Sequence, residues 1–175
     1  MGNFATLQPG GRPLVRFYLA FMLWFVGRAI QAAALVDPNV RKEFNDLPDD
    51  FSFSLGAAFN GPQMAIGKDS NGKVKYLGKN SNIVPQVKIT IKSMEALFLL
   101  FTFRESTPVA NSRERMTVEG NLSHACACVR ILDIVQVYLL PKPIAKLAIK
   151  RYPKWSLKKH TINRLLINLR AIIGF

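Results

Sequence analysis

The stretch VKITIKSMEALFLLF, residues 87–101, holds the clearest change of periodicity in the chain. From Val87 to Lys92 apolar residues alternate with polar ones, which predicts a half-buried strand with one apolar face and one basic face. The run from Met94 to Phe101 lacks this alternation and follows Ser93, a residue preferred at helix N-caps. The stretch therefore predicts a strand that leads directly into a short, buried helix.

More strands are predicted before this unit. Phe51, Phe53 and Leu55 alternate with serine and glycine, and two further short strands flank the turn at residues 70–72. The sequence of that turn, Ser-Asn-Gly, is typical of a β-hairpin.

The register of that hairpin depends on the length of its loop. With a three-residue loop, Gly72 takes the left-handed conformation, Ile66 faces Tyr76 and Lys68 faces Val74, so the apolar residues share one face. A two-residue turn would place Ile66 opposite Leu77 and divide the apolar residues between both faces. We therefore predict the three-residue loop.

Beyond the short helix, the pattern predicts a polar loop through Ser112, a strand at residues 115–119 and a long helix from Asn121 to about Leu140. The order is helices, four strands in meander order, a helix, one strand and then helices. Such segregated runs indicate an α+β fold with a five-stranded, mainly antiparallel sheet covered by helices, and with added N-terminal and C-terminal helices. We expect residues 1–48, 49–153 and 154–175 to form an apolar helical segment, a central domain and a basic helix within one compact unit.

The central region resembles the sterol carrier protein 2 domain over about residues 40–150. The resemblance rests on the Phe51-Ser52-Phe53 strand opening, the Asn-Gly hairpin and the strand–helix unit at residues 87–101. Its most specific part is Met116-Thr117-Val118-Glu119-Gly120-Asn121-Leu122, a strand that ends in glycine before the long helix.

This resemblance implies a curved five-stranded sheet with an apolar tunnel between sheet and helices. It also implies a carrier of sterols, acyl lipids, phospholipids or isoprenoid quinone-type molecules, and one bacterial branch is an accessory to ubiquinone biosynthesis. The long N-terminal helix and the basic C-terminus depart from the minimal domain, so the family's cavity entrance does not carry over simply.

A tunnel needs apolar residues on the inner sheet face and on the facing helices. The alternative is that the same side chains fill a solid core. The residues predicted to line the cavity are Phe53, Leu55, Ile66, Tyr76, Ile89, Ile91, Leu97, Leu100, Val129, Leu132 and Val135.

Residues 13–36 form an apolar segment whose uncharged part is bounded by Arg16 and Arg28. That part is shorter than the roughly 20 apolar residues of a membrane-spanning helix. A cleaved secretory signal, with small residues at 32–34, and an N-myristoylated start at Gly2 remain alternatives. The spacing favours a helix that packs on the protein or lies in the membrane interface.

The formal net charge is +13, and no Asp or Glu follows Asp133. A C-terminal helix is predicted with an apolar stripe and basic residues beside it, which suits an anionic membrane surface. The alternative is that the stripe docks on this domain or on a second copy of the chain. The residues predicted to bind the membrane are Trp155, Lys158, Lys159, Arg164, Leu165, Leu169, Arg170 and Ile172.

Three other function classes remain. A nucleic-acid-binding protein would also be basic, with Lys73, Lys75, Lys88 and Lys92 tracking phosphates and Tyr76 stacking on a base. A scaffold for lipid-pathway enzymes would have its cavity filled by its own side chains. An enzyme is not predicted, because no phosphate-binding loop, zinc spacing or nucleophile elbow is present.

We predict helix packing rather than a metal site for His124, Cys126 and Cys128, since a second pair of ligands is missing. No cofactor or metal is predicted. The sequence thus predicts a non-catalytic lipid carrier, cytoplasmic and peripherally associated with membranes.

Overall fold

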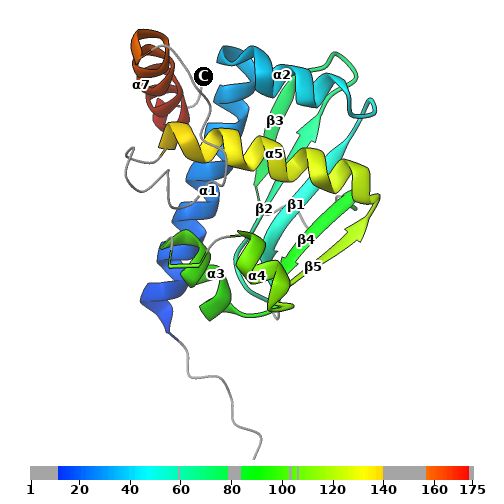
Figure 1. Cartoon of the computed structure of the whole chain (residues 1–175), viewed down its shortest axis with the longest axis vertical. Coiled ribbons are helices and arrows are strands. Elements are labelled where there is room, and N and C mark those ends of the chain that lie inside the picture. The colour runs from blue at the N-terminus through cyan, green and yellow to red at the C-terminus, as the bar shows by residue number, and fades with distance from the viewer. Residues whose placement is uncertain are drawn as a thin grey trace, which may run out of the picture.

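The computed structural model describes residues 12–58, 60–78, 84–102, 104–105, 107–139 and 157–173. Its centre is a five-stranded sheet in the order β3-β2-β1-β4-β5 (Figure 1). The strands are β1 (Ser52–Ala57), β2 (Gln63–Lys68), β3 (Val74–Gly78), β4 (Val87–Ile91) and β5 (Met116–Gly120). The expected α+β fold with a five-stranded, mainly antiparallel sheet is confirmed.

The predicted meander of four strands is wrong at its last step. Strand β4 pairs with β1 rather than with β3, and this pair is parallel. In this position Val87, Ile89 and Ile91 are all buried, at the middle of the apolar face. An edge position would leave this strand with only one neighbour. Alternation shows which face of a strand is apolar, but it carries no information on which strand lies beside it.

The predicted hairpin register is confirmed. Ile66 pairs with Tyr76 and Lys68 with Val74, and Gly72 has a φ of 73°. The backbone N–H of Gly72 donates to the carbonyl of Asp69 and so closes the turn. The apolar side chains of the hairpin therefore share the inner face of the sheet.

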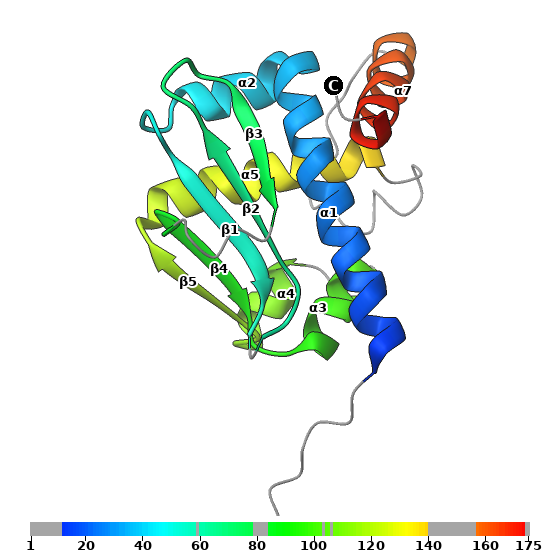
Figure 2. The same cartoon turned by 180° about the vertical axis from the view of Figure 1, so that it is seen from behind.

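The N-terminal segment forms helix α1 (Pro13–Val36), which runs along the β3 edge of the sheet (Figures 1 and 2). The Gln31 side chain accepts a hydrogen bond from the backbone N–H of Tyr76, so α1 satisfies a donor of the edge strand. The small residues at 32–34 are buried in the core. Through these contacts α1 is part of the packed domain.

A second helix, α2 (Pro38–Asn45), follows α1 after one residue and was not predicted from the sequence. Asp37 separates the two helices. Its carboxylate accepts a hydrogen bond from the backbone N–H of Asn39 and caps α2. Its other carboxylate oxygen accepts a 2.6 Å hydrogen bond from the buried hydroxyl of Tyr138.

Helices α3 (Met94–Phe101), α4 (Thr107–Ser112) and α5 (Leu122–Leu139) lie on one face of the sheet. Helix α3 has its predicted bounds, and the Ser93 hydroxyl caps it by accepting from the N–H of Ala96. The prediction of a loop through Ser112 is wrong at residues 107–112, which form helix α4. Pro108 is compatible with this helix because proline is tolerated in the first turn. The opposite face of the sheet carries no helix in the described part of the chain (Figure 2).

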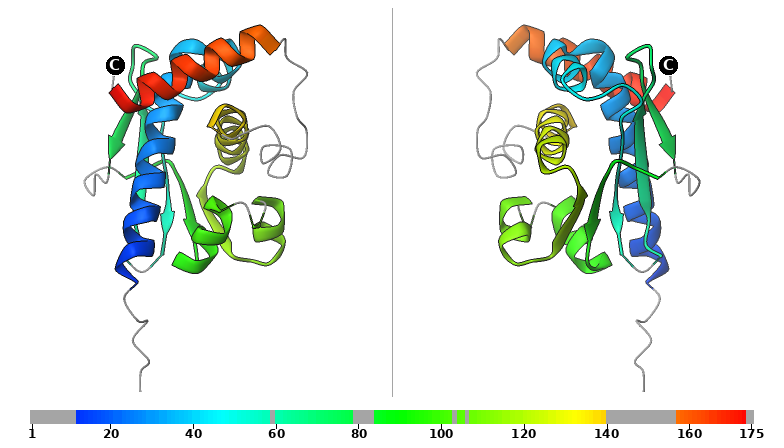
Figure 3. Two further views of the ribbon diagram at one scale, coloured as in Figure 1. Left: turned by 90° about the vertical axis from the view of Figure 1, so that its left-hand side faces the viewer. Right: turned by 90° about the vertical axis from the view of Figure 1, so that its right-hand side faces the viewer.

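Helix α7 (Leu157–Ile173) crosses the end of the molecule and contacts α1 and α5 (Figure 3). It packs against α1 through Ile167 and Ala171, which are both fully buried. The core below is closed by large side chains from the sheet, α1, α2 and α5, namely Leu19, Leu23, Ile30, Phe44, Phe51, Phe53, Met64, Ile66, Ile131 and Val135.

Gly120 is the glycine that ends β5 in the most specific motif of the sequence, and its φ is 109°. A Cβ there would meet the backbone carbonyl of Gln86, whereas a Cβ at Gly72 would meet nothing within 4 Å. Gly72→Ala should cost only about 1–2 kcal/mol, the penalty for a left-handed alanine. Gly120→Ala should cost about 1–3 kcal/mol more, because the backbone must also move. Urea denaturation of both variants measures the difference, and equal losses would contradict the close approach.

Candidate functional site

A cavity of about 600 Å³ lies between the sheet and helices α1, α3 and α5. This volume is within the range of pockets that bind small molecules, roughly 300–1,000 Å³. The sheet contributes four residues to its wall, and the helices supply the rest. The apolar lining residues are Phe21, Met22, Trp24, Phe25, Val26, Leu55, Ile89, Ile91, Leu100, Phe101, Met116, Val129, Leu132, Leu139 and Ile172.

Only part of the predicted lining set lies at this wall. The predicted residues that line the cavity are Leu55, Ile89, Ile91, Leu100, Val129 and Leu132. The others belong to the packed core or lie against it without lining the cavity, and they are Phe53, Ile66, Tyr76, Leu97 and Val135.

The division follows position along the strands. Phe53 and Ile66 pair with each other at the end of the sheet that α1, α2 and α5 fill, while Leu55 and Ile89 lie farther along the same face. The predicted tunnel is thus half core and half cavity. Alternation alone identifies the inner face, but it does not show where along a strand the packing stops.

Sequence reasoning missed the aromatic wall that α1 contributes through Phe21, Trp24 and Phe25. The apolar character of this helix was visible, yet its use was open between core, interface and leader. The spacing of these three residues, at i, i+3 and i+4, was the available signal.

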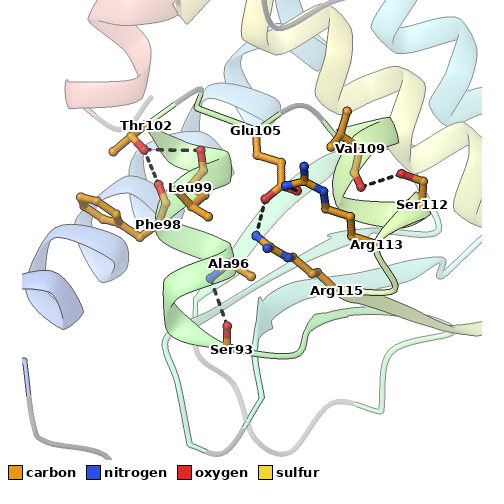
Figure 4. Close-up of polar contacts among 10 residues, drawn as sticks. All are labelled: Ser93, Ala96, Phe98, Leu99, Thr102, Glu105, Val109, Ser112, Arg113 and Arg115. Carbon is orange, nitrogen blue, oxygen red and sulfur yellow. Dashed lines mark hydrogen bonds and ion pairs between the residues drawn. The ribbon is translucent and has the colours of Figure 1, made fainter.

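Helix α3 forms a side of the cavity and is attached to α1. The hydroxyl of Tyr18 donates to the carbonyl of Phe101 over 3.5 Å, and the Tyr18 ring contacts the Phe98 ring edge to face. The Thr102 hydroxyl donates to the Phe98 carbonyl at the end of the helix (Figure 4). These contacts fix α3 to the first half of α1.

The corner between α3 and α4 is held by a buried carboxylate. Glu105 is 6% exposed and forms ion pairs with Arg113 at 3.2 Å and Arg115 at 2.6 Å (Figure 4). Two arginines satisfy both oxygens of this carboxylate, which offsets the free-energy cost of its burial. The wall that contributes Leu100, Phe101 and Thr107 therefore has a fixed base.

The described wall of the cavity reaches the surface at α1 and at α7. Phe21 and Ile172 are the two lining residues with exposed side chains, at 51% and 64%. Phe21 lies against the rings of Trp24 and Phe25 on the same helix. We call the surface of the wall at Phe21 and Ile172 the mouth.

The lining contains few polar side chains. Among the described lining residues they are Thr107 on α4 and Asp133 and Gln136 on α5. Asp133 is half-buried and makes no hydrogen bond or ion pair with the described residues. Burial in this apolar wall raises the pKa of the Asp133 carboxyl above its ordinary value.

Four residues of the apolar stripe of the C-terminal helix have exposed side chains, and one of them, Ile172, also lines the cavity. Leu165, Leu166, Leu169 and Ile172 are 62%, 41%, 46% and 64% exposed, while the opposite side of α7 is buried on α1. The buried contact of α7 with its own domain is made by Ile167 and Ala171. We call the four exposed residues the α7 stripe.

The other residues predicted to bind the membrane have different positions. Arg170 is exposed beside the α7 stripe, and Arg164 is half-buried on the side of the helix that faces the protein. Lys158 and Lys159 belong to α7, but their side chains lie outside the described residues, as does Trp155. A second exposed apolar row, Leu14 and Phe17, precedes Phe21 on α1.

The lysines predicted for a nucleic-acid surface are partly paired. Lys75 forms an ion pair with Asp69 at 3.5 Å and Lys88 with Glu119 at 3.4 Å. Tyr76 is half-buried against the core rather than displayed beside these lysines. The arrangement of basic side chains beside a free aromatic ring, which that function needs, is not formed by these residues.

His124 contacts the Phe51 ring edge to face, Cys128 is buried and Cys126 is exposed. Burial raises the pKa of the Cys128 thiol to about 12. Among the described residues, no group of three or more His, Cys, Asp or Glu side chains could hold a metal ion.

Helices α1 and α5 are long and apolar enough to cross a membrane by length and composition alone. However, 50% and 39% of their apolar windows are buried within the protein. Core helices meet the same criterion, so this observation is weak evidence and shows no membrane span.

No protein-family model matches this chain, and no curated protein sequence matches it. Solved structures do. One is a UbiJ-SCP2 ubiquinone synthesis protein, with 13% identity and a TM-score of 0.42 over 71% of this chain and 97% of the other. Another is sterol carrier protein domain 2 of Helicoverpa armigera, with 18% identity and a TM-score of 0.41 over 83% of this chain and 100% of the other.

A third similar structure is the apo form of sterol carrier protein 2 from Yarrowia lipolytica, with 16% identity and a TM-score of 0.42 over 75% of this chain and 98% of the other.

Replacing Asp133 by Asn should stabilise the protein at pH 7. The raised pKa means that the native state bears a penalty whenever the carboxyl is ionised, and Asn removes that penalty. As the pH falls through the raised pKa, the native carboxyl becomes neutral and the difference in Tm should shrink toward zero near the ordinary Asp pKa of about 3.9. Calorimetry between pH 7 and pH 4 measures this, with the exposed Glu114→Gln as control. A lower Tm for Asp133→Asn at pH 7 would contradict an unpartnered carboxylate.

Proposed function

We propose that this chain is a non-catalytic lipid carrier that holds a sterol, acyl lipid or isoprenoid quinone-type ligand in the cavity and docks on anionic membranes. The cavity of about 600 Å³, with its almost wholly apolar wall, carries the proposal. An apolar cavity of this size remains without favourable contacts when it is empty, because water finds few polar partners in it. An apolar ligand restores those contacts.

The mouth supports loading from a membrane. Its two exposed residues, Phe21 and Ile172, belong to the same helices that carry exposed apolar rows, Leu14 and Phe17 on α1 and the α7 stripe. A bilayer that covers these rows also covers the mouth. The ligand then passes between membrane and cavity with little exposure to water.

Charge supports an anionic surface as the partner. The chain carries +13, and all nine charged residues after Asp133 are basic. Each Lys or Arg near an acidic bilayer contributes on the order of 1 kcal/mol, less at high salt. Insertion of the exposed apolar rows is the second contribution to the free energy of membrane binding, because each fully buried leucine adds about 1.5–3 kcal/mol.

A bulky side chain inside the cavity should block loading. Val129→Trp projects an indole from α5 into the space, whereas Thr117→Trp adds the same group to the exposed edge strand β5. Overpacking costs about 1–3 kcal/mol, so ligand affinity of the first variant should fall roughly ten- to a hundredfold. The protein is incubated with lipid vesicles, re-isolated and analysed for bound lipid by mass spectrometry. Equal loading of both variants would place the ligand elsewhere.

Removal of apolar side chains from the α7 stripe should release the protein from membranes. Leu165→Ser with Leu169→Ser should weaken binding to anionic vesicles by roughly a hundredfold or more, since two leucines no longer insert. The matched control is Val84→Ser with Leu122→Ser, which changes two residues that are 91% and 72% exposed outside α7. Co-sedimentation with vesicles measures both.

The same pair of proteins also tests the competing occupant, a second copy of the chain. Light scattering of the wild type and of the stripe variant gives their masses in solution. A dimer that only the stripe variant loses, with unchanged vesicle binding, would assign the α7 stripe to self-association.

A further inference from the structure

We propose that Asp133 and Gln136 anchor the head group of the ligand, and that this anchor selects lipids whose polar end is a hydroxyl group over lipids that end in a carboxylate. The inference rests on the proposed carrier function. It concerns which lipid the cavity takes and which residues decide it.

The placement of the two side chains supports the anchor. Asp133 and Gln136 stand three residues apart on α5, so they share one side of the helix and both contribute to the cavity wall. Thr107 adds a hydroxyl from α4. Around these groups the wall is apolar, and a polar ligand atom inside the cavity would find its hydrogen bonds here.

Asp133 plays no structural part in the described protein. It makes no hydrogen bond or ion pair there, unlike Glu105, whose carboxylate is satisfied by two arginines. A half-buried carboxylate without a partner destabilises the fold. Its oxygens are therefore free to accept hydrogen bonds from a ligand.

The chemistry of the wall decides which head group fits. An ionised carboxylate only accepts hydrogen bonds, and it repels another anion in a medium of low dielectric constant. Among the described lining residues there is no lysine, arginine or histidine, so the described part of the wall offers no cation to an anionic head. A hydroxyl can donate to Asp133 and accept from the amide of Gln136.

An ammonium head would also donate to Asp133. The +13 charge of the chain repels a cationic ligand at long range, whereas an uncharged alcohol is not repelled. The alcohols and phenols among apolar lipids are therefore the class that this site fits.

Trp24 makes a direct experiment feasible. It lines the cavity, and it is one of only two tryptophans in the chain. The Trp155→Phe protein therefore has a single tryptophan, whose fluorescence reports on the cavity. The probes are a long-chain alcohol, its methyl ether and the matching carboxylic acid, each brominated at the same carbon so that it quenches Trp24 when bound.

At pH 7 the alcohol should bind roughly tenfold or more tightly than the ether, since only the alcohol donates to a charged acceptor. The acid should bind most weakly. In Asp133→Asn the acid should gain affinity because the repulsion is gone. In Asp133→Leu the advantage of the alcohol over the ether should disappear.

Equal affinities for the three probes in the protein with Asp133 intact would overturn the head-group anchor and leave the carrier function standing. An unchanged ranking in Asp133→Leu would overturn it as well. Absence of quenching by every probe would instead refute the carrier function, and the anchor with it. The Tm of each variant shows that the comparison is made on folded protein.

Discussion

The buried hydrogen bond from Tyr138 to Asp37 is the contact on which the arrangement of helices depends. Asp37 ends α1, caps α2 and accepts the Tyr138 hydroxyl at 2.6 Å, so one carboxylate joins three helices. Burial and this hydrogen bond both raise the pKa of the Tyr138 hydroxyl, which therefore stays a donor. A second link, from Arg130 to Glu43 at 2.8 Å, joins α5 to α2 nearer the outside. With α5 held at this end, the residues of its other side, among them Val129, Leu132 and Gln136, face the cavity instead of closing on the sheet.

The cavity is the space between two attachments. At one end α5 is bound to α1 and α2 above a filled core, and at the other end Glu105 fixes the base of α3 and α4 through its two arginines. Helix α1 takes part in both ends. Its second half is buried in the core, while its first half offers Phe21 to the mouth and Leu14 and Phe17 to the exterior. One helix thus serves as core, as cavity wall and as an exposed apolar surface, and this explains why it is apolar on nearly all sides.

Much of the fold could be predicted because its signals are local. Alternation at residues 87–91, the Asn-Gly turn and the cap at Ser93 act within a few residues, and they gave the strands, the hairpin register and the bounds of α3. The parallel pairing of β4 with β1 could not be derived, since it depends on a partner more than 30 residues away.

Only part of the candidate site could be predicted, for the same reason. Leu55 and Phe53 have the same pattern, share a face and are both buried, and only the packing of distant helices leaves a cavity beside Leu55 and none beside Phe53. The exposure of the α7 stripe also depends on packing. Ile167 and Ala171 occupy the side of α7 that is buried on the protein, so the leucines of the stripe lie on the exposed side.

The central claim is that the cavity holds a lipid-like ligand in the working protein. Its most direct test is mass spectrometry of the natively purified protein, followed by analysis of the organic extract that heat unfolding releases. We expect one apolar ligand per chain that survives purification and appears in the extract only after unfolding. Protein that remains empty after incubation with liposomes, with no ligand in either the native spectrum or the extract, would contradict the carrier function.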